Sequence, residues 1–328
     1  MLRKTIQRWN FVLKTVFLCL VVGLLYREIT GRSDLPELWA TFLGRFRWQY
    51  SGWLVAAVLL VPINWGLETQ KWRELMHRIE PIPYWLAYKA VLAGVAFSVI
   101  TPNRIGEYGG RVLMVKAEKW QTVVATLVGS VSQMIILMSA GFFGLVFYVF
   151  RNINISLHYQ IGMVMGLVLS VSVVLFFYFN IDLAIPIVRR LPYLTRGVKH
   201  LEVLREYTMQ QLALVLLYAL LRYMVYSFQY YLLLKFFGVH INLANAFLTI
   251  AFIFFLQTFL PLPPGTALLM RGELAVNIWA EYAHNPITIF AVSFGLWLIN
   301  VAVPALIGMV FITNINVLKS FGYDNPKS

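Results

Sequence analysis

The chain has 328 residues, of which 60% are hydrophobic, 16% aromatic and 12% charged. An ordinary soluble domain is about 45–50% apolar and about 25% charged, so this apolar excess cannot be buried inside soluble cores. The composition therefore excludes a soluble enzyme, a disordered chain and a disulfide-stabilised scaffold. Because Cys19 is the single cysteine, an internal disulfide and a metal site built on thiolates are excluded as well.

The charges are unbalanced, with 27 Lys and Arg against 14 Asp and Glu, a formal net charge of +13. In a soluble chain such an excess can indicate nucleic-acid binding. In a membrane chain it indicates cytoplasmic loops, contact with anionic lipid or an anionic substrate.

Apolar runs follow one another along the chain, and none shows the alternation of a β-barrel strand. The first follows a basic N-terminus like that of a signal sequence, but no small-x-small cleavage site follows it, so we expect an uncleaved first helix. Two runs, 84–100 and 244–260, are shorter than the roughly 20 residues that span a bilayer and end at the breakers TPNRIGEYGG and PLPPG. The sequence predicts an all-α polytopic membrane protein with about eight hydrophobic segments, at 11–26, 51–67, 84–100, 122–150, 161–179, 211–234, 244–260 and 286–312.

The distribution of basic residues predicts how the two short runs lie in the membrane. If every run crosses, the most basic connection, 181–210, falls on the outer side, contrary to the positive-inside rule. If each short run instead turns back with the helix that follows it, 15 cations lie on the cytoplasmic side and 6 outside. The cytoplasmic set is then Arg3, Lys4, Arg8, Lys71, Arg73, Arg78, Lys116, Lys119, Arg189, Arg190, Arg196, Lys199, Arg205, Lys319 and Lys327, and the outer set is Arg27, Arg32, Arg45, Arg47, Arg151 and Lys235.

This count predicts two re-entrant hairpins, the first entering from the cytoplasm and the second from outside, in an inner-membrane protein with a cytoplasmic N-terminus. Such segments at corresponding positions of two halves indicate a substrate site near the membrane midplane. We expect one transmembrane domain over 1–328, with 1–47 as first helix and outer loop and half repeats at about 48–180 and 181–312. The basic segment 181–210 is either an interfacial helix or a solvated cytoplasmic loop.

The first short run ends in a charged tip, 101–111. Pro102 breaks the incoming helix. If a helix restarts near Asn103, then Arg104, Glu107 and Arg111 lie on one face. Charged groups inside a membrane face the bundle interior and are paired. We expect Arg104 to pair with Glu107, which leaves Arg111 to hold an anion.

The second tip carries a similar set of residues after 261–265. Arg271 and Glu273 flank Gly272, and Glu273, Asn277 and Glu281 recur at helical spacing. Each hairpin thus has a Gly-Glu pair and an arginine beyond a proline-bearing turn. Helix N-termini and arginines both favour phosphate. The substrate-binding residues we predict are Asn103, Arg104, Glu107, Arg111, Arg271, Glu273 and Asn277.

Two other interpretations of these charges stay open. The arginines and glutamates could form internal salt bridges between the hairpins without a ligand, or they could lie on the surface if the hairpins do not enter the membrane. Elsewhere, Arg222 lies inside an apolar run and is a weaker site candidate, whereas Glu68, Lys71 and Glu74 follow a run and are expected in a loop. No metal-binding spacing and no nucleotide motif occurs, so we expect no cofactor, no metal and no catalytic residue.

The tip 102–111, Pro-Asn-Arg-Ile-Gly-Glu-Tyr-Gly-Gly-Arg, resembles the P-x-R-x-G-E-x-x-x-R signature of the lysylphosphatidylglycerol synthase transmembrane family, a flippase-like membrane domain. The segment 261–273 resembles the family's second Pro-Gly-rich segment ending in Glu, although its glycines are fewer and its spacing is longer. Lys71-Trp72-Arg73 resembles a recurring Arg-Trp-type loop. The resemblance covers about 48–312. The chain ends about 16 residues after the last run, so we expect no soluble aminoacyl-transfer domain.

The resemblance implies a flippase-like transporter that moves an anionic or aminoacylated phospholipid, or a polyprenyl-phosphate-linked lipid, between leaflets. The expected partners are the lipid and the membrane, with a homodimer or a separate lipid-modifying enzyme left open, and no nucleic acid. The alternatives are a non-catalytic membrane partner of a glycosyltransferase and an integral membrane enzyme acting on lipid phosphates. The enzyme would need a metal-binding or nucleotide-binding cluster, which the sequence does not contain.

Overall fold

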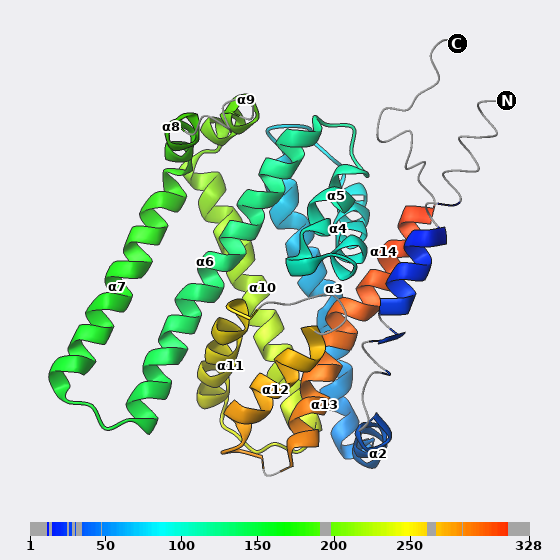
Figure 1. Cartoon of the computed structure of the whole chain (residues 1–328), viewed down its shortest axis with the longest axis vertical. Coiled ribbons are helices and arrows are strands. Elements are labelled where there is room, and N and C mark those ends of the chain that lie inside the picture. Colours follow the sequence, from blue (N-terminus) through cyan, green and yellow to red (C-terminus); the bar gives the residue numbers. More distant parts are fainter. Residues whose placement is uncertain are drawn as a thin grey trace.

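A computed structural model describes residues 12, 15–24, 26–27, 30, 35–46, 48–190, 198–260, 267–283 and 285–313. Within these ranges the chain is helical and contains no strand. The all-α prediction is therefore confirmed. The helices stand roughly side by side, and the short helices α8 and α9 lie at one end of the bundle (Figure 1).

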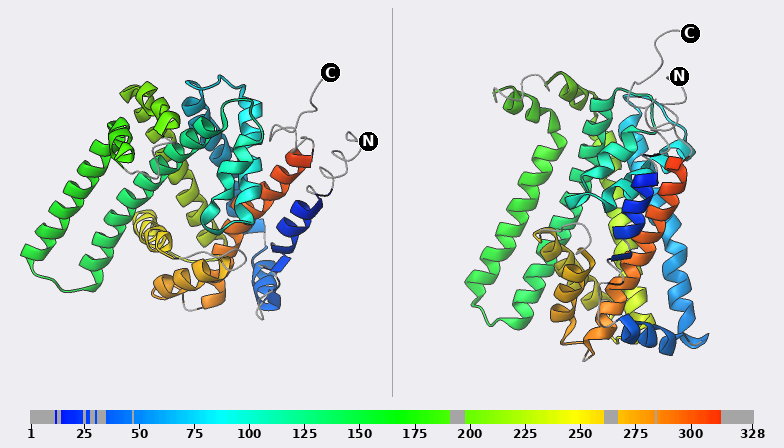
Figure 2. Two further views of the ribbon diagram at one scale, coloured as in Figure 1. Left: turned by 45° about the horizontal axis from the view of Figure 1, so that its top comes forward. Right: turned by 45° about the vertical axis from the view of Figure 1, so that its right-hand side comes forward.

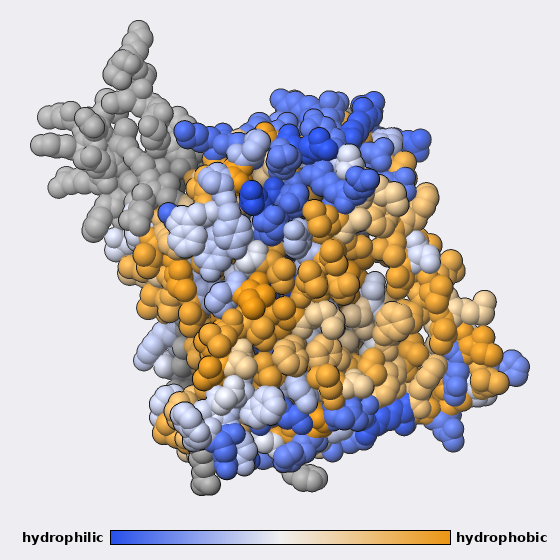
Figure 3. All heavy atoms as spheres, turned by 180° about the vertical axis from the view of Figure 1, so that it is seen from behind, coloured by the Kyte–Doolittle hydropathy of each residue, from blue (hydrophilic) through white to orange (hydrophobic). Residues whose placement is uncertain are grey.

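Five helical segments among the described residues are long and apolar enough to span a membrane. They are α3 (Trp48–Met76), α6 (Lys119–Asn152), α7 (Leu157–Phe179), α10 (Met209–Phe236) and the continuous helix Pro286–Thr313. The last comprises α13 (Pro286–Trp297), the π-helical turn η5 (Leu298–Ala302) and α14 (Val303–Thr313). Seen from behind, a broad apolar band separates two polar ends (Figure 3), as expected of a chain surrounded by lipid.

Three shorter apolar helices complete the predicted set: Thr15–Leu24, α4 (Tyr84–Val99) and α11 (Leu243–Thr258). The amphipathic helix α2 (Leu35–Arg45) was not predicted. The segment 181–210 contains several short pieces among its described residues: η2 (Ile181–Leu183), α8 (Ala184–Arg189), α9 (Val198–Leu201) and η4 (Glu202–Glu206).

Two helical hairpins enter the bundle from opposite ends. The first consists of α4, η1 (Pro102–Arg104) and α5 (Gly106–Val112), and the second of α11 and α12 (Ala267–Trp279). The first lies in the end of the molecule that carries α8 and α9, and the second lies toward the opposite end (Figures 1 and 2). Each hairpin therefore begins and ends at the same end of the bundle.

Each hairpin packs against a long helix from the other part of the chain. Outside its own hairpin, α4 packs chiefly on α14, and α11 packs chiefly on α6. Glycines allow these close approaches, since an added Cβ would lie 2.0 Å from the Leu92 carbonyl oxygen at Gly308 and 2.6 Å from the Leu248 carbonyl oxygen at Gly144. The proposed boundary between half repeats stays a prediction, but the two parts interlock through their hairpins.

The long helices α3 and α10 pack along each other and form the centre that carries the site. Tyr207, just before α10, is buried and donates a hydrogen bond to the Leu75 carbonyl oxygen at 3.2 Å. Burial raises the pKa of its phenol above the ordinary value, so the group stays a neutral donor that fixes the start of α10 to the end of α3.

Candidate functional site

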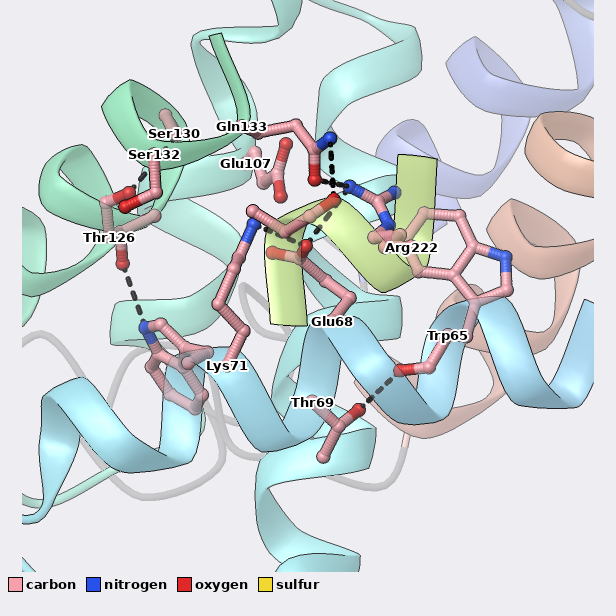
Figure 4. A network of polar contacts seen from close by, with 12 residues as sticks. Trp65, Glu68, Thr69, Lys71, Glu107, Thr126, Ser130, Ser132, Gln133 and Arg222 are labelled. Atoms are coloured by element: carbon pink, nitrogen blue, oxygen red, sulfur yellow. Dashed lines mark hydrogen bonds and ion pairs between the residues drawn. The ribbon is translucent and has the colours of Figure 1, made fainter. Parts of the chain in front are cut away.

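A cluster of charged side chains lies inside the bundle with Glu68 at its centre (Figure 4). Glu68 Oε2 lies 2.7 Å from Lys71 Nζ and 3.0 Å from Arg222 Nη1, and Glu68 Oε1 lies 2.7 Å from Arg111 Nη2. Arg111 also pairs with Glu107, and Arg104 Nη2 lies 3.6 Å from Glu107 Oε2. The six side chains therefore form one continuous charge network.

The network joins helices that are far apart in sequence. Glu68 and Lys71 lie on α3, Glu107 and Arg111 on α5, and Arg222 on α10. Because α3 is helical through Met76, residues 68 and 71 fall on the same face. The network therefore fixes the first hairpin to the central pair of long helices.

Close packing within the first hairpin brings α5 into position. An added Cβ at Gly110 would lie 2.6 Å from the Cα of Gly94 on α4. At Gly94 it would lie 3.2 Å from Arg111 Cγ. Only glycine allows the two backbones to approach this closely, and this approach places the Arg111 guanidinium in the interior.

Aromatic rings cover two of the cations. The guanidinium carbon of Arg222 lies 5.0 Å from the centroid of the Trp65 ring, and that of Arg111 lies 5.4 Å from the Trp72 ring. Such cation–π contacts stabilise a cation that has lost water. The indole of Trp72 donates to Thr126 Oγ1 at 3.0 Å, which links this wall to α6. Gln133, also on α6, accepts from Arg222 at 3.4 Å.

The cluster carries more positive than negative charge: Lys71, Arg104, Arg111 and Arg222 against Glu68 and Glu107. The side chains of Glu68, Lys71 and Arg111 are at most 5% exposed, whereas that of Arg104 is 44% exposed. Electrostatic interactions are stronger where water is excluded. The arrangement can therefore attract an anion, and Arg104 is the cation of the network most accessible from outside.

Arg104 also has an unusual backbone conformation. Its φ of +62° is the only positive value among the non-glycine residues that the structure describes. The left-handed region is costly for a residue with a long side chain. This conformation turns the chain between η1 and α5 and places Arg104 at the tip of the first hairpin.

The predicted pairing of Arg104 with Glu107 is confirmed, but the prediction that Arg111 is left over is wrong. Arg111 is buried and contacts two carboxylates, because the helical turn from Glu107 and the approach of α3 surround it. The backbone of Asn103 lies in η1, and its side chain lies outside the described residues.

The predicted residues of the second hairpin, Arg271, Glu273 and Asn277, lie on α12. None of them is among the partners of Glu68 and Glu107 named above. Glu273 and Asn277 are exposed, and the Asn277 amide donates to the Glu273 carbonyl oxygen at 3.0 Å. The backbone of Arg271 accepts from Gln257 on α11 at 3.3 Å. Beyond them, Glu281 lies 2.7 Å from Arg151 at the end of α6. The turn 261–266 lies outside the described residues.

Glu68 and Lys71 were missed as site residues because they were expected in a loop. That prediction is wrong, since α3 continues nine residues past the apolar run 51–67 and buries both side chains. The absence of Gly and Pro between 67 and 80 was the available signal for a continuing helix. Arg222, the weaker candidate, belongs to the network.

The described residues of the site do not form a cluster of carboxylate or histidine side chains that could bind a metal ion. Across the described ranges, no three His, Cys, Asp or Glu side chains gather in a way that could hold a metal ion. The carboxylates of the network are instead engaged by Lys and Arg, which are groups that recognise phosphate and carboxylate.

Comparison with known proteins agrees with this architecture. No match to the chain was found among curated proteins or among solved structures. A family model described as the lysylphosphatidylglycerol synthase TM region matches residues 11–272, which begins before the predicted range of similarity and ends earlier, at Gly272. The match includes the helix Thr15–Leu24, all six residues of the charge network, the whole of α11 and the first residues of α12. The chain is therefore a lipid-related integral membrane protein that belongs to the lysylphosphatidylglycerol synthase TM region family.

Proposed function

We propose that this protein moves a lipid with an anionic phosphate headgroup between the leaflets of the inner membrane, without chemically altering it. The observation that carries the proposal is the excess of cations in the Glu68 network, buried inside a bundle with an apolar belt. Buried charges are costly in a membrane and mark substrate or ion pathways.

In this proposal the two hairpins are re-entrant and form the two gates of the site. Arg78 and Lys116 lie in the connections that flank the first hairpin, and Lys119 is the first residue of α6. These basic residues fit the cytoplasmic side by the positive-inside rule. Half-helices that meet near the midplane are typical of transporter binding sites. Arg104, at the exposed tip, makes the first contact with the headgroup, while the acyl or prenyl chains stay in the surrounding bilayer.

Glu107 holds Arg104 and Arg111 in place for this contact, since it lies between them. Arg271 and Glu273 have the corresponding role on the second hairpin, where Glu273 and Asn277 are exposed and accessible to a headgroup. Rocking of the two interlocked parts against each other then exposes the headgroup first to one leaflet and then to the other.

A reconstituted translocation assay tests this function. The protein is placed in phosphatidylcholine vesicles that contain fluorescent phosphatidylglycerol, and dithionite quenches the label in the outer leaflet. We expect the protein to speed the loss of the protected signal, and Arg104→Ala to slow it about tenfold or more, as the loss of a charged contact of about 1.4 kcal/mol would do.

The matched control is Arg78→Ala, which removes an arginine of the surface that lies outside the network and bonds Gln211 at 3.3 Å. It should leave the rate unchanged, whereas Arg271→Ala should slow it through the second hairpin. Equal rates for the wild type, Arg104→Ala and Arg271→Ala would overturn the assigned roles. Vesicles with and without protein that lose signal equally would overturn the function.

A further inference from the structure

One carboxylate in the site holds three cations at once. Lys71 on α3, Arg111 on the first hairpin and Arg222 on α10 all lie within 3.0 Å of the Glu68 oxygens. A phosphate bound in a protein is held in the same way, with its oxygens shared among Arg and Lys donors. Glu68 therefore lies where an anionic headgroup would bind, and it pairs with the cations that the headgroup would use.

We propose that Glu68 is an internal counter-anion that competes with the lipid headgroup for these cations and thereby sets how tightly the headgroup is held. This inference rests on the transport function proposed above. Glu68 does not itself bind the lipid. It acts through Lys71, Arg111 and Arg222, so it is a positioning residue that determines affinity.

The geometry provides a way for the cations to be exchanged. Arg111 lies between Glu68 and Glu107, so its guanidinium can turn from Glu68 toward an arriving headgroup while it keeps a carboxylate partner. Arg222 has Gln133 as a second partner and Trp65 as a ring neighbour. Each arginine therefore keeps a second partner while it moves: the Glu107 carboxylate for Arg111, and the Gln133 amide and the Trp65 ring for Arg222.

Competition of this kind serves turnover. A pathway conducts only if binding is favourable enough for entry and weak enough for release. The four cations of the network attract a phosphate, and the charge of Glu68 offsets part of that attraction. Without this charge the headgroup would be held more strongly and released more slowly.

Glu68→Gln removes the charge and keeps the shape of the side chain. We expect the half-saturating mole fraction of fluorescent phosphatidylglycerol to fall about tenfold, and the maximal translocation rate to fall by a similar factor because release becomes slower. The control is Glu74→Gln, on the same helix but outside the network, where the carboxylate accepts only from Gln70 at 3.3 Å among the contacts described. It should change neither quantity.

A purely structural role for Glu68 gives a different result. In that case Glu68→Gln lowers the amount of folded protein and the maximal rate, while the half-saturating mole fraction stays unchanged or rises. Either result would overturn the competition. Rescue offers a second criterion, since Glu68→Gln combined with Arg222→Gln restores the original charge excess and should return the half-saturating fraction toward the wild-type value.

The competition can also be tested if the single variant Glu68→Gln does not fold. In detergent, the shift in unfolding temperature caused by dioctanoyl phosphatidylglycerol reports binding to the folded state. If Glu68→Gln does not fold, Arg222→Gln is compared with the double variant, and the lipid should bind the double variant about tenfold more tightly. Equal binding would overturn the inference. A wild-type protein that moves no labelled lipid would overturn the transport function itself, and the inference with it.

Discussion

The carboxylate of Glu68 and the guanidinium of Arg111 lie 2.7 Å apart, and this ion pair connects α3 to the first hairpin in the interior of the bundle. Both side chains are almost completely buried. Removing a charge from water costs several kcal/mol, which a single partner does not offset. The additional partners of each group, Lys71 and Arg222 for Glu68 and Glu107 for Arg111, make the burial sustainable.

Removing Arg111 should therefore destabilise the protein strongly. Arg111→Ala leaves Glu68 and Glu107 buried with fewer partners, and breaking a buried pair from one side costs about 3–5 kcal/mol. Unfolding in detergent micelles measures the change. The control is Arg151→Ala. The Arg151 side chain, which pairs with Glu281, is 34% exposed, so its removal should lower the stability by less than about 1 kcal/mol. Equal losses for the two variants would contradict the buried network.

Replacing Arg104 should lower transport without lowering the stability of the protein. Its positive φ is unfavourable for Arg but natural for Gly, so Arg104→Gly should hold or raise the stability, by up to about 1 kcal/mol. The same change removes the exposed cation at the hairpin tip, so translocation of phosphatidylglycerol should fall.

Arg104→Lys is the informative companion, because it keeps the charge and the strained backbone. It should retain more transport than Arg104→Gly and gain no stability. A large loss of stability in Arg104→Gly, measured by thermal unfolding in detergent, would show that the side chain holds the hairpin together rather than contacting the lipid.

Two neighbouring glycines of α5 should respond very differently to a single methyl group. At Gly110 a Cβ would lie 2.6 Å from the backbone of α4, whereas at Gly109 no heavy atom beyond the neighbouring residues and the backbone of its own helix lies within 4 Å of it. Gly110→Ala should push α5 away from α4 and destabilise the protein by about 1–3 kcal/mol. Gly109→Ala should be neutral or stabilising by up to about 1 kcal/mol, since Ala favours a helix over Gly. Similar melting temperatures for the two variants would contradict the close approach.

The helical class, the segment order and the Arg104–Glu107 pair could be predicted from the sequence, because they depend on long apolar runs and on local helical spacing. The centre of the site could not. Glu68 meets Arg111 across 43 positions and Arg222 across a still longer separation, and no local pattern specifies which helices pack together.

The end of α3 shows why the start of a charged segment does not by itself predict where a helix ends. A helix that leaves the apolar core of the membrane was expected to stop at Leu67, where the charged residues begin. Instead the helix continues to Met76, because its charges find partners on α5 and α10 and are buried rather than solvated. Partnering between distant elements is a tertiary property, and it overrode the hydropathy signal.

The proposed re-entrant topology makes a prediction about sidedness that cysteine labelling can check. After Cys19, which is exposed, is replaced by Ser, single cysteines are introduced at four exposed positions that flank the hairpins. His77 and Lys116 flank the first hairpin, and His240 and Ala280 flank the second.

If both hairpins are re-entrant, an impermeant maleimide should label His77→Cys and Lys116→Cys only from the cytoplasmic side, and His240→Cys and Ala280→Cys only from the outside. The reason is that each hairpin begins and ends at the same end of the bundle (Figures 1 and 2). If a hairpin instead crosses the bilayer an odd number of times, its two flanking positions label from opposite sides. Labelling of both His77→Cys and Lys116→Cys only from the outside, with both His240→Cys and Ala280→Cys labelled only from the cytoplasm, would keep the hairpins but reverse the orientation that the basic residues predict.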